Sequence, residues 1–212
     1  MKINKLILYS PELGAIRDFY VQVLGFRMVE AEKNSFSLKA GQSILEFRES
    51  EKALPYHFAF NIPRNLIRES HSWLKERVDL IPFEGNDQIE FEAWDASAFY
   101  FYDPDKNIVE FIARRPLAVE DEAPFSPEKI INISEIALAV ESIDPIFEAL
   151  KSNTGIEIYS GAFDRFLAAG DTEGLFIMID QNRKKWFPTG DTPQPVFFEV
   201  QVEVNSQDYE IQ

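Results

Sequence analysis

The chain has 212 residues, of which 45% are hydrophobic and 14% aromatic, enough to bury the core of one or two globular domains. Its formal charge of −15 argues against a nucleic-acid surface, because phosphate contacts depend on clustered Lys and Arg. The absence of cysteine excludes disulfides, thiolate metal sites and cysteine nucleophiles, and no apolar run has the length of a membrane span. We therefore expect a cytoplasmic protein without nucleic-acid or membrane partners.

The first 50 residues predict a strand, a helix and three further strands. Residues 3–9 alternate with a period of two, which is typical of a strand, and an amphipathic pattern that Gly25 can close follows from Ser10. Turn residues then separate three short strands at 26–29, 35–39 and 43–48. The unit is βαβββ.

The same order of elements recurs twice. In the second unit a strand at 56–61 and a helix at 66–77 precede strands near 88–91, 98–102 and 107–113. An acidic segment with prolines, residues 116–129, predicts a linker. The third unit has the same order in weaker form: 133–140, 144–150, 156–159, 165–169 and 174–179. A last strand, 196–204, either extends the third sheet or opens a truncated fourth unit. Internal repetition therefore predicts an α+β fold.

Glu110 is the most unusual polar residue of these strands. It stands among four apolar neighbours, Ile108, Val109, Phe111 and Ile112. An unsatisfied polar group in such surroundings costs on the order of 2–7 kcal/mol. We therefore expect a cation, a hydrogen-bond donor or a bound ligand beside Glu110.

Three segments resemble the vicinal oxygen chelate superfamily, which includes glyoxalase I, extradiol dioxygenases, fosfomycin-resistance enzymes and bleomycin-resistance proteins. These segments are LILYSPELGAIRDFYVQVLGF, HFAFNIP and WDASAFYFYDPDKNIVEFIAR. The resemblance implies paired βαβββ modules whose curved, mixed β-sheets form a cup, with the helices packed on the outer face. It assigns residues 1–115 to the pair, with module 1 at about 1–50 and module 2 at about 55–115. Residues 130–212 become a third, degenerate module with an extra C-terminal strand.

The resemblance also implies a metal site in the cup. The family's four ligand positions fall on Lys5, Glu46, His57 and Glu110, and three of these residue types match. Alternation along the strands supports the assignment of the three matching positions. The mixed N and O ligands would suit Zn, Mn, Fe or Ni. Glu46 and Glu110 are also the candidates for proton transfer.

Lys5 leaves two functions open, because a protonated lysine repels a metal ion. In the first, Lys5 takes the place of the metal's charge through charge-assisted hydrogen bonds to Glu46 and Glu110, and a metal-free cup binds a small molecule. In the second, the protein is a divalent-metal-dependent lyase, isomerase or dioxygenase that acts on a substrate with vicinal oxygens. Ligand contacts are expected from Tyr9, Arg48, Phe99 and Phe101.

The third module has Glu135 and Ile177 at the ligand-equivalent positions, and an isoleucine cannot bind a metal. We therefore expect this module to serve packing or dimerisation. A homodimer is expected because the unpaired third module leaves a sheet face or edge to cover.

Overall fold

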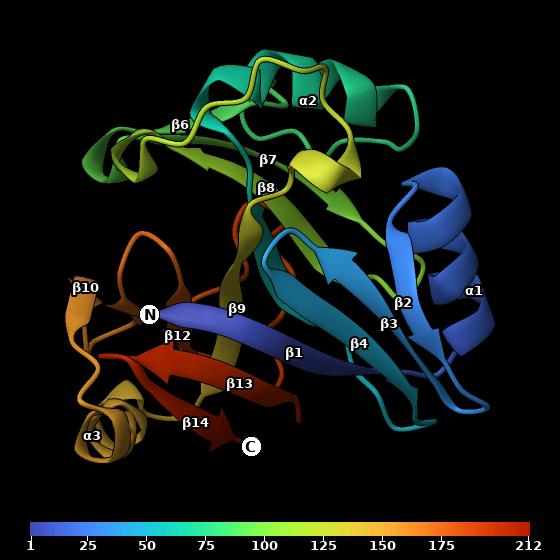
Figure 1. Cartoon of the computed structure of the whole chain (residues 1–212). Coiled ribbons are helices and arrows are strands. Elements are labelled where there is room, and N and C mark those ends of the chain that lie inside the picture. The colour runs from blue at the N-terminus through green and yellow to red at the C-terminus, as the bar shows by residue number, and fades with distance from the viewer.

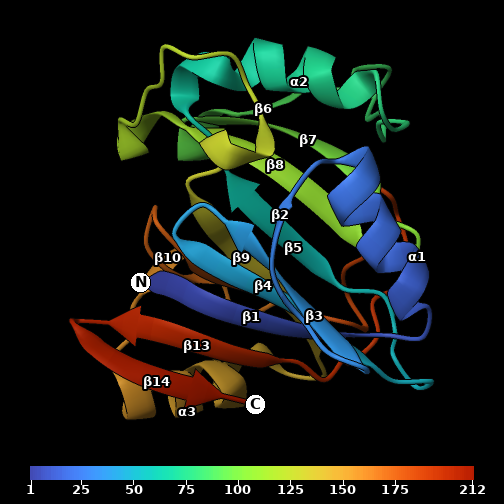
Figure 2. The same cartoon turned by 45° about the vertical axis from the view of Figure 1, so that its right-hand side comes forward.

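The computed structural model describes residues 1–212 and confirms the α+β class. Fourteen strands form one open, mixed sheet, and the three α-helices lie on the outside of the molecule (Figures 1 and 2). None of these helices has both the length and the apolar character needed to cross a membrane.

The strands and helices follow the βαβββ order three times. The first module consists of β1 (Lys2–Ser10), α1 (Leu13–Asp18) with a π-helical turn (Phe19–Val23), β2 (Arg27–Ala31), β3 (Ser35–Ala40) and β4 (Ser43–Glu49). The second consists of β5 (His57–Asn61), α2 (Ile67–Lys75), β6 (Ile89–Phe91), β7 (Ala96–Tyr102) and β8 (Ile108–Arg114). The third consists of β9 (Asn132–Val140), α3 (Ile143–Thr154), β10 (Ile158–Ala162), β11 (Phe166–Gly170) and β12 (Leu175–Asp180).

The modules pair differently from the expectation. Strand β5 of the second module runs antiparallel to β9 of the third, with Ala59 opposite Glu135, so these two modules form the main cup. The path through the sheet is β2-β3-β4-β1-β9-β5-β8-β7-β6, so β1 and β5 are not neighbours. Modules 1 and 2 therefore do not form the expected cup. Contacts between residues far apart in the chain determine which strand pairs with which. The alternation of residues along one strand does not contain this information.

The C-terminal residues complete the first module instead of extending the third. Strand β13 (Glu199–Val204) runs antiparallel to β1, and β14 (Gln207–Ile211) pairs with β13. Figure 2 shows β13 beside β1 and β14 beyond β13, at the end of the molecule away from α2. Strand β13 runs antiparallel to β1, just as β9 runs antiparallel to β5. Strand β13 therefore takes the position of the first strand of a truncated fourth module.

Residues 116–129 contain no strand and pack against the second module. Phe125 is buried, and its ring centre lies 5.3 Å from that of Trp73 of α2. The backbone N–H of Phe125 donates to Glu69 at 2.8 Å. This segment, expected as a linker, therefore helps to cover α2.

The two faces of the sheet differ in side-chain size. The face toward the helices is filled by large side chains such as Phe58, Phe60 and Phe111. The inner face of the second and third modules has a separate cluster of 13 buried residues, six of which are alanines: Ala59, Ala96, Ala98, Ala137, Ala139 and Ala168. Small side chains on an inward-curved face leave room for a cavity.

Candidate functional site

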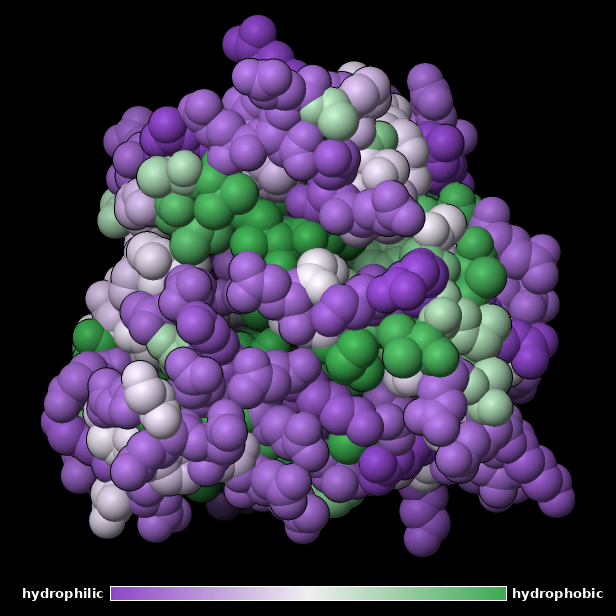
Figure 3. Space-filling model, in the orientation of Figure 1, coloured by the Kyte–Doolittle hydropathy of each residue, from purple (hydrophilic) through white to green (hydrophobic).

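A cavity of about 310 Å³ lies in the cup of the second and third modules. Strands β5, β8 and β9 bring His57, Glu110 and Glu135 to it. The remaining wall is mainly aromatic and aliphatic: Phe91, Trp94, Tyr100, Ile112, Phe166, Ile177, Ile179, Trp186 and Phe187, together with Lys184. Such a space, mostly apolar with a few converging polar groups, is typical of a small-molecule site. Figure 3 shows a mainly hydrophilic surface on which hydrophobic residues gather in a hollow band below the region of α2.

His57 is held as a neutral imidazole. Its Nδ1 lies 3.0 Å from the carbonyl oxygen of Ile108, which accepts a hydrogen bond from Nδ1–H. Burial lowers the pKa of His57 to about 4, and the positive charge of Lys184 acts in the same direction. The Nε2 lone pair is therefore free, and it lies 3.6 Å from Oε2 of Glu110. A backbone acceptor on the other ring nitrogen is how proteins commonly orient a metal-binding histidine.

Two buried carboxylates lie side by side in this cavity. Glu110 and Glu135 are only 3% and 2% exposed. Burial raises the pKa of Glu110 well above its usual range, and repulsion by Glu135 adds to this effect. Arg114 and a hydrogen bond with Tyr100 oppose the increase without reversing it. Burial also raises the pKa of Glu135, although its ion pair with Arg114 acts against this.

Arg114 supplies the buried positive charge of the site. Its Nη2 forms an ion pair with Oε1 of Glu135, and its guanidinium lies 5.1 Å from the ring centre of Trp94. With both carboxylates ionised and His57 neutral, His57, Glu110, Arg114 and Glu135 together carry one excess negative charge, and Lys184 in the cavity wall forms no ion pair with either carboxylate. Either a proton or a cation must balance it, since an unpaired buried charge is strongly unfavourable.

The three residues fit a divalent metal. One donor atom from each of His57, Glu110 and Glu135 lies within 4.8 Å of the other two. Zinc–ligand bonds of about 2.0–2.2 Å place two ligands of one ion up to about 4.4 Å apart, so small side-chain movements would complete the set. Because Glu135 uses Oε1 for Arg114, its second oxygen is free for a metal. One imidazole and two carboxylates suit Zn, Mn, Fe or Ni.

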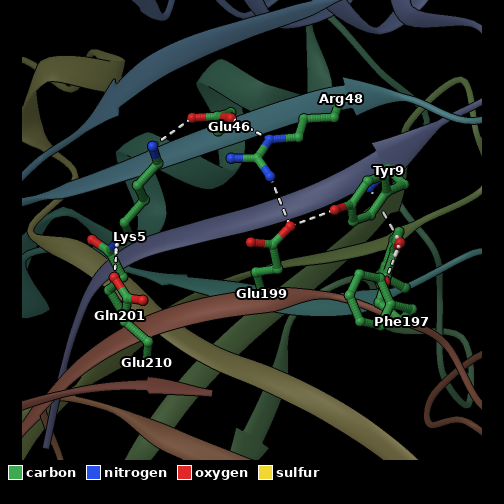
Figure 4. Close-up of polar contacts among 9 residues, drawn as sticks. Lys5, Tyr9, Glu46, Arg48, Phe197, Glu199, Gln201 and Glu210 are labelled. Atoms are coloured by element: carbon green, nitrogen blue, oxygen red, sulfur yellow. Dashed lines mark hydrogen bonds and ion pairs between the residues drawn. The ribbon is translucent and has the colours of Figure 1, made fainter. Parts of the chain in front are cut away.

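Lys5 and Glu46 lie in a second hollow, of about 570 Å³, on the first module. There Lys5 Nζ is 2.5 Å from Glu46 Oε2, and Arg48 Nε is 2.6 Å from Glu46 Oε1. Arg48 also pairs with Glu199 of β13 at 2.7 Å, and Glu199 accepts a hydrogen bond from Tyr9. In Figure 4, Lys5 and Arg48 approach Glu46 from opposite sides. Lys5 and Arg48 both have carboxylate partners, so this network needs no metal ion to balance its charges.

The structure therefore does not bring the four expected metal positions into one hollow. His57 and Glu110 lie in the cup of the second and third modules, whereas Lys5 and Glu46 lie in the second hollow. The expected ion pair between Lys5 and Glu46 is present, but the expected contact of Lys5 with Glu110 is not. The reason is the module pairing, which places the first module beside β13.

The expected ligand contacts are also redistributed. Tyr9 and Arg48 line the second hollow. Phe99 and Phe101 are fully buried in the core on the helix side of β7. The ring centre of Phe101 lies 6.3 Å from that of Phe19. Tyr100, between them, points to the other face and lines the cavity. Because side chains alternate along a strand, the face of β7 decides which aromatics reach a ligand.

Several residues of the site were not among the expected ones: Tyr100, Glu135, Lys184, Trp186 and Phe187, which line the cavity, and Arg114, which pairs with Glu135. The signal for Glu135 was its ligand-equivalent position in the third module. The residues after β12 carried no such signal, because they lie in the proline-containing segment between β12 and β13.

No protein-family model matches the chain, and neither does any curated protein sequence. Among solved structures, a candidate dioxygenase from Bacillus subtilis subsp. subtilis str. 168 is 19% identical with a TM-score of 0.62. The match covers 85% of this chain and 64% of that chain, so this chain spans less than two thirds of it.

A lactoylglutathione lyase from Agrobacterium tumefaciens is 21% identical, with a TM-score of 0.45 over 56% of this chain and 97% of that one. A glyoxalase/bleomycin resistance protein/dioxygenase from Nocardioides is 16% identical, with a TM-score of 0.45 over 58% and 87%. The similarity to the Bacillus subtilis protein shows that the chain has the same fold, as the resemblance in the sequence implied.

Proposed function

We propose that the chain belongs to the vicinal oxygen chelate superfamily and is a divalent-metal-dependent lyase, isomerase or dioxygenase. Its substrate is a small, mainly apolar molecule with two neighbouring oxygens. The observation that carries this proposal is the buried cluster of His57, Glu110 and Glu135, in which Arg114 pairs with Glu135 and no Lys or Arg pairs with Glu110. A cation would balance the remaining negative charge.

The residues have distinct roles in this proposal. A bound divalent ion would act as a Lewis acid toward the substrate oxygens. His57 presents a neutral Nε2 to it, and Arg114 orients Glu135 through Oε1. Of the two carboxylates expected to transfer protons, only Glu110 lies in this cavity, so we assign the proton transfer to Glu110. The mainly apolar wall would limit the access of water to the reacting groups.

Metal-free binding is the second candidate, and the ion pair between Arg114 and Glu135 favours it. In this case Glu110 carries a proton, which leaves the buried group neutral. Its raised pKa is compatible with this state. The cup would then hold a small molecule without transforming it, as in the first of the two functions inferred from the sequence.

Metal analysis of protein purified without a histidine tag distinguishes the two candidates. We expect one divalent ion per chain after reconstitution with Zn, Mn, Fe or Ni, and a higher melting temperature with metal. His57→Ala and Glu135→Gln should lose the ion. Glu46→Gln is the matched control, because Glu46 lies in the second hollow, and it should keep the ion.

The absence of bound metal after reconstitution, with an unchanged melting temperature, would exclude the enzymatic proposal and leave metal-free binding. Loss of the ion in Glu46→Gln would instead exclude the assignment of the site to the second and third modules. The homodimer and the cytoplasmic location remain predictions.

A further inference from the structure

Lys184 is a cation in the wall of the cavity. It belongs to the segment that follows β12 and is half-buried beside Trp186 and Phe187. Its Nζ lies 5.3 Å from the ring centre of Phe166, which also lines the cavity. The ammonium group is therefore positioned to meet a molecule in the cavity.

This ammonium group has no anionic partner in the protein. Lys184 Nζ takes part in none of the chain's ion pairs and in none of its side-chain hydrogen bonds, unlike its neighbours: Arg183 pairs with Asp180, and Lys185 donates to Thr192. Burial lowers the pKa of Lys184, and the nearby positive charge of Arg165, which also forms no ion pair, lowers it further. The chain has a net charge of −15, so carboxylates are abundant, yet none of them forms an ion pair with this cavity cation.

We infer that the molecule bound in this cavity is an organic anion, with an apolar or aromatic body and an oxyanion group that pairs with Lys184. The inference rests on the proposed function only in using the same cavity. A half-buried cation without a partner gains a charge-assisted hydrogen bond when a ligand supplies the anion. The rings of Phe91, Trp94 and Phe166 offer flat apolar surfaces for the body of the ligand.

The arrangement of charges also predicts how the ligand lies. An anionic group is repelled by Glu110 and Glu135 and attracted by Lys184, so it should point toward the segment after β12. The opposite end of the ligand then faces the two carboxylates. Lys184 would thus select anions and orient them for the groups on β5, β8 and β9.

A pair of matched probes tests this inference: 2-naphthoate, which is an anion, and 2-naphthamide, which is neutral and of nearly the same shape. Binding is measured by calorimetry on protein stripped of metal with a chelator, so that the result does not depend on the metal. We expect 2-naphthoate to bind about tenfold more tightly than 2-naphthamide, which corresponds to about 1.4 kcal/mol.

Substitutions assign this preference to one side chain. Lys184→Met should weaken 2-naphthoate binding about tenfold and leave 2-naphthamide binding unchanged. Lys184→Arg keeps the positive charge and should keep the preference for 2-naphthoate. Lys185→Met removes the same charge from the neighbouring, exposed residue and is the matched control, which should behave as the wild type.

Three outcomes would overturn the inference: no binding of either probe at millimolar concentration, equal binding of both probes, or a preference for the acid that survives Lys184→Met. A preference for 2-naphthoate that appears only after metal is added, and that survives Lys184→Met, would show that the anion binds the metal instead of Lys184. Failure of the metal analysis would leave the probe experiment intact, so the two proposals fail separately.

Discussion

Arg114 and Glu135 form an ion pair between two modules, with side chains that are 0% and 3% exposed. Their strands, β8 and β9, are not neighbours, because β5 lies between them. The pair therefore spans the floor of the cup and connects the second module to the third. The Nη1 atom of Arg114 has no hydrogen-bond partner in the protein, so Glu135 is the main compensation for this buried charge.

Removal of Glu135 should therefore destabilise the protein strongly. In metal-free protein the raised pKa of Glu110 favours its protonated form, so Glu135→Ala leaves the Arg114 charge buried without an ion-pair partner. We expect the free energy of unfolding to fall by about 3–5 kcal/mol. The double variant Arg114→Met/Glu135→Leu removes both charges and should remain much closer to the wild type. Urea unfolding of metal-free protein measures both. A loss below about 1 kcal/mol for Glu135→Ala would show that Arg114 is solvated.

His57 should make stability depend on pH. Its pKa is about 4 in the folded protein, against about 6.5 for an unperturbed histidine, so the unfolded chain binds more protons between these values. The contribution of neutral His57 is therefore fully present above about pH 6.5 and decreases by about 3 kcal/mol as the pH falls to 4.

The measurement for His57 is the difference in unfolding free energy between metal-free wild type and His57→Gln, from pH 7.5 to 4. The subtraction removes the opposite trend from Glu110, whose raised pKa makes its own contribution decline as the pH rises. A difference that does not change with pH would contradict the buried, neutral state of His57.

Glu46 should matter little for stability and not at all for metal content. Burial acts against its ionisation, but hydrogen bonds from Lys5 and Arg48 outweigh this effect and lower the pKa of Glu46. The hollow is open and its cations remain solvated, so Glu46→Gln should reduce the free energy of unfolding by less than about 1 kcal/mol. Chemical unfolding tests this value, and a loss of several kcal/mol would show that the network holds β4 to the rest of the sheet.

Gly41 should not tolerate a side chain. Its φ is +60°, and an added Cβ would lie 2.1 Å from the carbonyl oxygen of Ile131, so both the conformation and the contact require glycine. We expect Gly41→Ala to cost at least about 2 kcal/mol. Gly14, in α1, has nothing within 4 Å of its Cβ position, and Gly14→Ala should stabilise the protein by about 0.5–1 kcal/mol. Thermal unfolding of the two variants should show shifts of opposite sign.

The local elements could be predicted because each depends on neighbouring residues. The alternation of residues 3–9 and 107–113 predicts strands that the structure places at Lys2–Ser10 and Ile108–Arg114. In the turn between β7 and β8, Lys106 adopts the left-handed conformation, with a φ of +64°.

The composition of the site was only partly predictable. His57 and Glu110 come from one module, and their strands β5 and β8 are parallel neighbours, so they belong to the same cluster whichever module lies beside them. Lys5 and Glu46 likewise stay together within the first module. The sequence by itself thus determined two correct pairs of residues and the repeated order of elements.

Only the tertiary structure decided which modules share a cup. The first strands β1, β5 and β9 all offer alternating side chains and free backbone edges, and pairing between them joins residues far apart in the chain. That choice brought Glu135 and Arg114 to His57, placed Lys5 beside β13 and put Lys184 over the cavity. The physical reason is that periodicity records which face of a strand is buried, whereas the identity of the facing strand depends on how well two distant surfaces pack and balance their charges.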